Sequence, residues 1–363
     1  MGLSATYHQI LTRIDMLPSK MWCLRAITWL LCTKRPLELR ELMTAISIND
    51  MDITAGWDPT RVPSDPLDVI FDCKGLISCT STLHGRIVQF THASVREFLL
   101  ANPLVVGSTM LEYHIFPESK GHALLARWCL TYLTLKSKTR LDSVDNVHLN
   151  LFTYVKQFWN VHIQSAGSTE LLAVFLQVLS DTEVLHSLGG GSPLHVALRY
   201  NLTHITEHIL KMQACLESLD KQSNTVIHLA VINPRWLETL LVQKHNIHHK
   251  NLDGRTPLHM AACVPYLPGQ MELLSNLASS ISILIDHGAD IELQDAQGCT
   301  PLHLAASSGQ LETISCLLEN KASIHAVDLG QLTPLHHAVK RGDHQAVQIL
   351  IGFDADIGSR DDK

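Results

Sequence analysis

The heptapeptide Thr300-Pro301-Leu302-His303-Leu304-Ala305-Ala306 decides the fold of this chain, because related segments recur along its C-terminal half. Thr-Pro-Leu-His returns intact at 256–259 and 333–336, and weaker copies begin at Ser192 and Thr225. The copies begin at 192, 225, 256, 300 and 333, so the steps are 33, 31, 44 and 33 residues. Self-similarity at such a period indicates a repeat architecture.

The residue types of this heptapeptide suit the start of a helix. Thr300 is a good N-cap, because its hydroxyl accepts a hydrogen bond from an otherwise unpaired helix N–H. Pro301 occupies the first helical position, where a missing N–H costs nothing. His303, three residues after the cap, can reach back to the Thr residue as a capping-box side chain does. Each copy should therefore begin a helix.

A second helix should follow in each copy. Gly309 breaks the first helix, and apolar residues at helical spacing predict another helix over 311–318. Asp295 and Gly298 supply turn chemistry for an extended segment, or finger, that links one copy to the next. A single helix pair cannot bury its apolar face, so the copies must stack on one another.

Thr-Pro-Leu-His-x-Ala at a period near 33 resembles the ankyrin repeat, and the resemblance extends from about residue 185 to the end. It implies antiparallel helix pairs, projecting fingers and a concave binding surface. We therefore predict a mainly α chain whose residues 181–363 form an ankyrin-repeat solenoid of about five repeats.

Three features depart from the pattern. Val226 replaces the Pro, and Lys321 stands where the second helix of the repeat usually ends in Gly, as Gly288 does elsewhere. An αL cap at a residue other than Gly costs about 1 kcal/mol. The 44-residue step places about eleven extra residues around 264–280, and the prolines and glycine at 265–269 predict a loop there.

The N-terminal residues 1–105 have a different pattern, which predicts a winged-helix domain. Apolar spacing and turn residues predict helices over 7–17, 22–31, 37–46 and 67–73, strands over 76–79 and 86–90, and a helix that begins at the capping box of Ser94. Proline residues in 57–66 indicate a loop.

Separated blocks of this domain resemble fungal STAND-type proteins, in which a winged-helix region follows a NACHT nucleotide-binding domain and precedes a repeat array. The blocks are Ile27-x-Trp29-Leu30, Arg35-Pro36-Leu37-x-Leu39-x-Glu41-Leu42, Cys73-x-Gly75-Leu76-Ile77 and His92-Ala93-Ser94-Val95-Arg96-Glu97-Phe98-Leu99. The phosphate-binding motif G-x-x-x-x-G-K-[ST] is absent, so we expect the sensing and relay half of such a protein without its NTPase domain.

A helical connector is predicted over 106–180. Segments 123–130 and 149–159 read as helices with aromatic anchors, and Tyr154, Trp159 and His162 resemble the connector ahead of ankyrin arrays in the same fungal proteins. The segment 171–176 is apolar almost all round, which predicts a buried helix that caps the stack at its N-terminal end.

The composition of the chain excludes some classes of function. Apolar residues make up 46 % and charged residues 17 % of the 363 residues, which is typical of a globular chain. A formal charge of −7 argues against sequence-independent nucleic-acid binding, and Glu38, Arg40 and Glu41 in the third predicted helix do not favour phosphate. No membrane-spanning run is present. We therefore expect no nucleic-acid partner and no membrane span.

The cysteines indicate the cellular compartment of the protein, and the first six residues bear on whether it is N-myristoylated. Nine cysteines without a C-x-x-C pair suggest a reducing, intracellular compartment, either cytoplasm or nucleus. The start Met1-Gly2-Leu3-Ser4-Ala5-Thr6 matches the N-myristoylation pattern, but we expect a chance match rather than modification at Gly2, because no second membrane signal accompanies it.

The sequence contains few motifs that could form a catalytic or metal-binding site. His204-Ile205-Thr206-Glu207-His208 fits the H-x-x-E-H pattern of zinc peptidases, and His204 and His208 share one helix face. A third protein ligand has no visible candidate, so a zinc-dependent hydrolase is an unfavoured alternative. The pairs His248-His249 and His336-His337 are expected to be structural or surface residues. We predict no catalytic residue, no cofactor and no metal site.

The favoured function is a non-catalytic scaffold that binds a partner protein of unknown identity through ankyrin fingers and the concave face. An accessory or regulatory protein of a fungal pathway, for example in secondary metabolism, and a truncated remnant without activity are alternatives. Tyr200 and Tyr266 are candidate hot spots. The predicted partner-binding residues are His248, His249, Lys250, Arg255, Met260, Gln294, Gln297, Ser307, Ser308, Lys340 and Arg341.

Overall fold

The computed structural model of the 363-residue chain describes most of its length and is mainly helical. The described residues are 2–48, 65–82, 85–101, 118–138, 151–167, 170–212, 217–242, 246–264 and 271–359. They divide into two units, one of residues 1–184 with 202–205 and one of residues 185–201 with 206–363. The loop predicted within 57–64, the prolines and glycine at 265–269 and Tyr266 lie outside the described residues.

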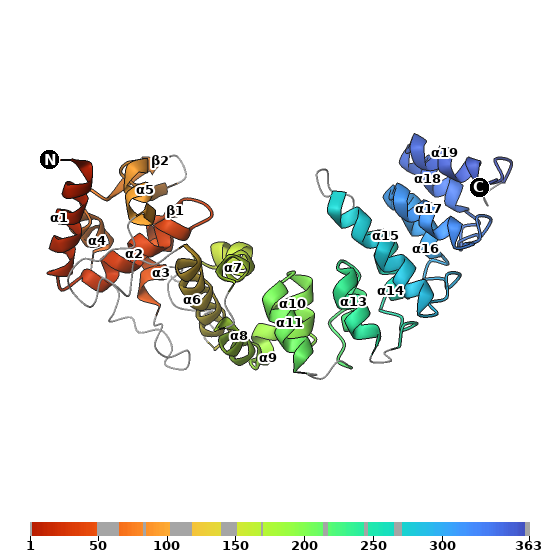
Figure 1. Cartoon of the computed structure of the whole chain (residues 1–363), viewed down its shortest axis with the longest axis horizontal. Helices are drawn as coiled ribbons and strands as arrows, with labels where there is room; N and C mark the ends of the chain where they lie inside the picture. The colour runs from red at the N-terminus through yellow and green to blue at the C-terminus, as the bar shows by residue number, and fades with distance from the viewer. Residues whose placement is uncertain are drawn as a thin grey trace. The chain divides into compact units, whose positions relative to one another are not determined.

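The first part of the N-terminal unit combines short helices with a small antiparallel sheet (Figure 1). The strands lie in the order β1-β3-β2, and Leu37 pairs with Val88 while Ile77 pairs with Phe90. The elements are α1 (Leu3–Asp15), α2 (Lys20–Cys32), β1 (Leu37–Glu38), α3 (Leu39–Ser47), α4 (Pro66–Asp72), β2 (Ile77–Thr82), β3 (Gly85–Phe90) and α5 (Ala93–Ala101).

Two predicted helix starts were wrong. Leu37 belongs to strand β1, and α3 begins two residues later because Glu38 and Glu41 form the capping box that fixes its first turn. The last helix of this part begins at Ala93 rather than at Ser94. His92 supplies the cap, since its Nδ1 accepts from the Ser94 N–H at 3.1 Å, and the Ser94 hydroxyl lies 2.8 Å from the Tyr7 hydroxyl instead.

The helices α6 (Glu118–Lys138), α7 (Phe152–Ala166) and α8 (Leu171–Leu179) also belong to this unit, and α9 (Thr182–Ser187) contains residue 184, at which the unit ends. The fully buried Trp29 of α2 stacks on Trp128 of α6 with 5.8 Å between ring centroids, and it meets Tyr154 of α7 edge-on at 5.6 Å. These aromatic contacts hold α2, α6 and α7 together. The apolar α8 buries only part of its surface, with Ala173 exposed.

A chain of polar groups that starts at the exposed Lys34 and continues through buried side chains also links α6 and α7 to the segment after α2. Lys34 Nζ lies 3.5 Å from His122 Nε2, His122 Nδ1 lies 2.9 Å from His162 Nδ1, and His162 Nε2 lies 2.8 Å from the Tyr154 hydroxyl. The lysine can only donate, so each ring donates to the next group and both rings are neutral. Burial lowers the pKa of His122 to about 4 and that of His162 to about 3.

The C-terminal unit consists of stacked helix pairs, and Figure 1 shows successive pairs side by side from green to blue. First helices pack on first helices, as α14 and α18 do on α16, and second helices pack on second helices, as α15 and α19 do on α17. The pairs are α10 (Pro193–Arg199) with α11 (Thr203–Lys211), α12 (Val226–Ala230) with α13 (Pro234–Leu241), α14 (Pro257–Cys263) with α15 (Met271–Asp286), α16 (Pro301–Ser308) with α17 (Leu311–Glu319), and α18 (Pro334–Arg341) with α19 (His344–Gly352).

The sequence signals for these helix ends are confirmed. Pro301 is the first residue of α16, and Gly309 ends that helix in the left-handed conformation with φ +71°. Lys321 also adopts positive φ, at +68°, in the place where Gly288 stands two helices earlier. The strained cap predicted at Lys321 is therefore present.

The segment predicted as a loop around 264–280 is largely helical. From Met271 onward it belongs to α15, which is 16 residues long, whereas the equivalent helix α17 has nine. The apolar residues Leu277, Ile281 and Leu284 recur at helical spacing and are fully buried, and this burial favours helix over loop. The prolines at 265 and 268, near the start of the segment, led us to extend the predicted loop too far.

Candidate protein-binding site: the finger row

Each first helix in the C-terminal unit is locked by its signature histidine. Within a repeat, the imidazole Nδ1 accepts from the backbone N–H of the capping Ser or Thr, at 3.1 or 3.2 Å. Towards the next repeat, Nε2 donates to the backbone oxygen of the residue before the next cap. These bonds run from His195 to Asn224, His228 to Arg255, His259 to Cys299 and His303 to Leu332, at 3.0–3.1 Å.

These contacts fix the protonation state of the four rings. A backbone N–H can only donate and a carbonyl can only accept, so Nδ1 must carry a lone pair and Nε2 a proton. The rings are buried as well, and burial lowers the pKa of His228 and of His259 to about 4. Burial also lowers the pKa of His195 and of His303. The neutral rings therefore connect successive repeats.

The turns that precede the caps Thr225, Thr256, Thr300 and Thr333 are each shaped by one Asp or Asn, which is buried at 220, 251 and 295 and half-buried at 328. Its Oδ1 accepts from the backbone N–H groups two and four residues later, at 2.8–3.0 Å, which closes a tight turn. We call the four turns together the finger row, and they comprise residues 220–224, 251–255, 295–299 and 328–332.

Backbone hydrogen bonds join neighbouring turns of the finger row. Each bond is donated by the residue after the turn-shaping Asp or Asn. Three bonds run between turns of the finger row: Leu252 N–H to Gln222 O (2.9 Å), Ala296 N–H to Asp253 O (2.9 Å) and Leu329 N–H to Gln297 O (3.0 Å). A fourth, from Lys221 N–H to Gly189 O (3.2 Å), joins the turn 220–224 to the segment before the first cap. The finger row is thus a continuous hydrogen-bonded edge rather than a set of independent loops.

Two glycines make this close approach feasible. Gly254 and Gly298 have φ of +74° and +77°, and a Cβ at either position would lie 2.6 Å and 2.8 Å, respectively, from the backbone nitrogen of Ala296 and Leu329 in the next turn. Real Cβ atoms do not approach other atoms so closely. These glycines are the sequence signal that could have predicted the contact between turns.

The residues predicted to bind a partner differ in exposure. His249, Arg255, Met260, Ser307 and Ser308 are half-buried. The exposed members of the set are His248, Lys250, Gln294, Gln297, Lys340 and Arg341. Of the two candidate hot spots, Tyr200 is half-buried, and burial raises its pKa.

Several of these candidates bind the neighbouring repeat. Lys250 Nζ donates to the Gln294 backbone oxygen at 2.7 Å, and Gln294 Nε2 donates to the Val327 oxygen at 3.2 Å. Arg255 lies 3.4 Å from the buried carboxylate of Asp295, so it is an ion-pair partner inside the stack. Part of the predicted surface therefore stabilises the array.

Three other candidates also make contacts within the array. His249 Nε2 donates to the Ser223 oxygen at 3.2 Å. Arg341 donates to the Ser307 backbone oxygen at 3.1 Å, which ties the end of α18 to α16. Substitution of His249 or Arg341 would alter both the surface and the packing, so neither isolates a role in binding.

Two apolar side chains on the finger row were not among the partner-binding residues predicted from the sequence. Leu252 is 70 % exposed and Leu329 is 75 % exposed, and both directly follow the turn-shaping residue. Val339 of α18 is exposed as well. Large exposed apolar side chains at matching repeat positions are candidates for contact with a partner. The recurrence of Leu at this position was the signal available in the sequence.

The H-x-x-E-H segment does not form a metal-binding group in the described part of the chain. His204 is exposed, and Glu207 lies 3.1 Å from Arg235 in an ion pair. A carboxylate held by an arginine is a poor general base. The geometry thus gives no support to hydrolysis at this segment.

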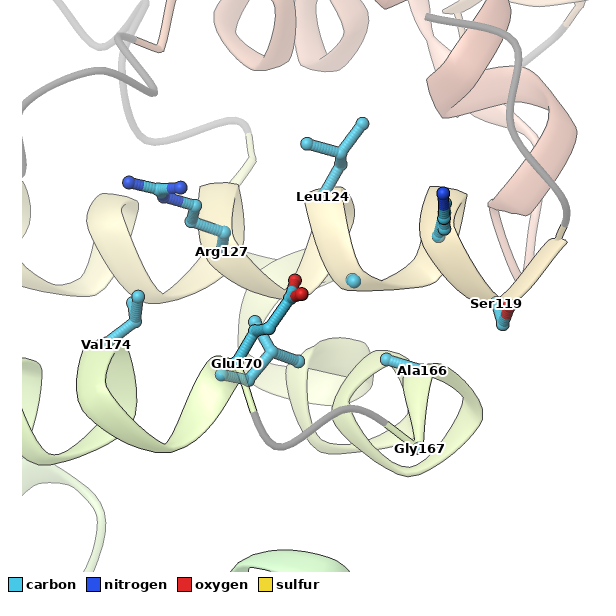
Figure 2. A pocket seen from close by; sticks show the side chains of 10 residues that line it. Ser119, Leu124, Arg127, Ala166, Gly167, Glu170 and Val174 are labelled. Atoms are coloured by element: carbon cyan, nitrogen blue, oxygen red, sulfur yellow. The ribbon is translucent and has the colours of Figure 1, made fainter. Parts of the chain in front are cut away.

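A cavity of about 610 Å³ lies in the N-terminal unit beside α6. Figure 2 shows Arg127 and Leu124 on α6 and Glu170 and Val174 on the other wall. Its ten lining residues include Lys120 but no histidine, cysteine or aspartate. Mixed charges without a nucleophile–base pair do not make an active site.

Within the described ranges, no helix combines the length and apolarity that crossing a bilayer requires.

Residues 271–361 match the protein family described as ankyrin repeats, in three copies. The C-terminal region of the chain therefore contains ankyrin repeats, as the Thr-Pro-Leu-His pattern predicted. The helix pairs that begin at Pro193 and Val226 lie outside this match and share its capping geometry.

Three characterised proteins illustrate what the chain is similar to. Inversin of Canis lupus familiaris is 27% identical over 144 residues, which cover 32% of this chain and 13% of Inversin. The target of rapamycin complex 2 subunit AVO2 of Saccharomyces cerevisiae is 30% identical over 132 residues, 35% of this chain and 28% of AVO2. The human transient receptor potential cation channel subfamily A member 1 is 25% identical over 261 residues, 69% of this chain and 21% of the channel. The chain spans less than a third of each relative.

Proposed function

We propose, on the premise that the C-terminal region holds ankyrin repeats, that the chain is a non-catalytic scaffold that holds a partner protein on its finger row. Ankyrin repeats imply protein–protein interaction, and a relative whose name makes it a subunit of a complex is consistent with a scaffold. The partner and the pathway are open.

The observation that supports this proposal is the continuous hydrogen bonding of the finger row. Its turns are joined by backbone bonds, and its signature histidines are fixed in one tautomer between repeats. A surface ordered before binding loses less conformational entropy when a partner docks. His248, Gln297 and Lys340 are exposed, as are the apolar Leu252 and Leu329, and together they offer the mixed polar and apolar contacts of a protein interface.

We propose three domains with the boundaries inferred from the sequence: a winged-helix domain over 1–105, a helical connector and cap over 106–180, and five ankyrin repeats over 181–363. Helices α1 to α3, the β2–β3 hairpin and α5 follow one another in winged-helix order. The division between the two units falls after Val184, close to the proposed start of the array. The five helix pairs that begin at Pro193, Val226, Pro257, Pro301 and Pro334 would be the five repeats, and the match at 271–361 covers the last two pairs together with α15 of the third.

In this proposal the N-terminal part relays or tethers, as in the fungal NACHT-associated proteins that it resembles, and it needs no nucleic acid or cofactor. Burial raises the pKa of the Cys32 thiol to about 12, so this side chain is an inert thiol suited to a reducing compartment. We place the protein in the cytoplasm or nucleus on that basis.

The test is partner capture with a matched pair of triple variants. The first carries Gln297→Ala in the finger row, His248→Ala just before the turn 251–255, and Lys340→Ala on the first helix α18. We expect it to bind the partner captured by the wild-type chain at least tenfold more weakly, about 1.4 kcal/mol, at an unchanged Tm. Binding would be measured by titration calorimetry.

The control triple variant carries Glu238→Ala, Glu312→Ala and Gln348→Ala, three exposed residues on second helices. It should bind like the wild-type chain. Equal affinity of the two triple variants would contradict the assignment of the finger row, and turnover of a substrate by the purified chain would contradict the scaffold proposal.

A further inference from the structure

Three side-chain positions converge wherever one turn of the finger row meets the next. The first position is the residue just before a capping Ser or Thr. The second is the turn-shaping Asp or Asn of the next turn. The third is the residue just after the signature histidine of the helix that follows this next turn. At the last such junction these positions hold Cys299, Asp328 and His337, whose ligand atoms all lie within 4.8 Å of one another.

The same positions are occupied by different residue types at the two preceding junctions. Asn251 Nδ2 donates to Asn224 Oδ1 at 2.9 Å and lies 3.9 Å from Met260 Sδ. At the next junction Arg255 neutralises Asp295 at 3.4 Å, and Leu304 fills the third position. The carboxylate of Asp328 has neither an arginine nor an amide in the equivalent place. It instead faces a thiol and an imidazole, two groups that bind transition metals.

We propose that Cys299, Asp328 and His337 form a binding site for a divalent transition metal ion, with Zn²⁺ best suited to this sulfur, oxygen and nitrogen set. His337 Nε2 lies 2.9 Å and Cys299 Sγ 3.9 Å from Asp328 Oδ2. Ligands at zinc distances of about 2.0–2.3 Å lie about 3.3–3.6 Å apart around a tetrahedral ion. Shifts of well under 1 Å at these two contacts therefore suffice, and water takes the fourth position.

The surrounding structure orients the ligands. Asp328 Oδ1 is held by the N–H groups of Gly330 and Leu332 at 2.8 and 2.9 Å, which leaves Oδ2 directed at the other two residues. The His337 ring meets the His303 ring edge-on at 5.5 Å. Hydrogen bonds from neighbouring groups, such as the two that Asp328 Oδ1 accepts, are typical of metal ligands. The His337 side chain is 18 % exposed, so an ion can enter from solvent.

Binding would exchange protons in a defined way. In the free site His337 Nε2–H donates to Asp328 Oδ2. Binding places the ion on the Cys299 sulfur with release of the thiol proton, and the proton on His337 Nε2 moves to Nδ1 so that Nε2 can bind the ion. The ion would join the turns 295–299 and 328–332 to α18.

Cobalt(II) titration of the full chain, fully reduced and free of chelator, tests the site. We expect one equivalent of Co²⁺ to give the intense visible bands of a tetrahedral ion and a near-ultraviolet thiolate-to-cobalt band, both displaced by Zn²⁺. Cys299→Ser should abolish the thiolate band, and His337→Leu should weaken binding at least tenfold. His337→Leu places at this junction the residue type that Leu304 already supplies one repeat earlier, so it should fold.

Matched controls are Cys316→Ser and His344→Ala, a thiol and an imidazole outside the site, and both should titrate like the wild-type chain. Circular dichroism in chelator checks that each variant is folded. A wild-type chain without a thiolate band would overturn the proposal, and so would a band that persists in Cys299→Ser. Neither result bears on the finger row as a partner-binding surface.

Discussion

Gly298→Ala should destabilise the C-terminal unit by about 2–4 kcal/mol, the sum of left-handed backbone strain and of overpacking against the next turn. The new Cβ would lie 2.8 Å from the Leu329 nitrogen, which donates the 3.0 Å bond to the Gln297 oxygen. Either the turn at 328–332 moves away and this bond is lost, or the backbone at 298 leaves its preferred conformation. Urea unfolding followed by circular dichroism measures the loss.

Gly288→Ala provides a matched control. This glycine has φ +88°, but its added Cβ would meet nothing within 4 Å. The substitution should therefore cost only the backbone strain, about 1 kcal/mol. Equal costs at Gly288 and Gly298 would show that the neighbouring turns do not touch, which contradicts the finger row as described.

Acid should destabilise the C-terminal unit well above the range in which carboxylates titrate. The folded-state pKa values of His228 and His259 are lowered to about 4, against about 6.5 in an unfolded chain. Between these values the unfolded state binds more protons, so stability is complete above pH 6.5 and falls as the pH drops toward 4. Each ring should contribute a loss of about 3 kcal/mol, measured as the free energy of unfolding against pH.

A single substitution isolates this effect. His259→Gln is neutral at every pH, so the variant should be less stable at pH 7 but lose about 1 kcal/mol less per pH unit between pH 6 and 4.5. His344→Gln, at an exposed position on α19, should leave the slope unchanged. A wild-type free energy of unfolding that stays constant from pH 7 to 5 would contradict the neutral, buried rings.

Local signals in the sequence predicted much of the array. The capping role of His303, the start of the first helix at Pro301 and the end of that helix at Gly309 depend on residues within one turn of each other. Such interactions are visible in the sequence because the residues that make them are neighbours. Lys321 was predictable for the same reason, since a helix end after Asn320 requires a residue at positive φ.

Contacts between distant residues were not predictable in this way. The bond from Leu252 N–H to Gln222 O and the approach of Gly254 to Ala296 depend on how repeats stack. Lys250 and Arg255 appeared to be surface residues, although each reaches across to the next repeat.

At two other places the structure differs from what local sequence signals predict, because contacts between distant residues determine it. Leu37 continues a helical pattern in the sequence but pairs with Val88 across a sheet. The metal-ligand geometry at Cys299, Asp328 and His337 joins residues up to 38 positions apart, so no local motif announces it. That the exposed finger-row side chains contact a partner protein stays a prediction, because exposure alone does not identify a partner.

Hydrogen exchange at the Leu252 and Ala296 amides tests most directly whether the turns form one rigid edge. Both amides donate at 2.9 Å to a backbone oxygen of the preceding turn. In the free chain they should exchange as slowly as the interior amides of α14 and α16, because opening them requires separating whole repeats. Exchange of these two amides at the rate of an unfolded peptide, while the helices stay protected, would contradict the account.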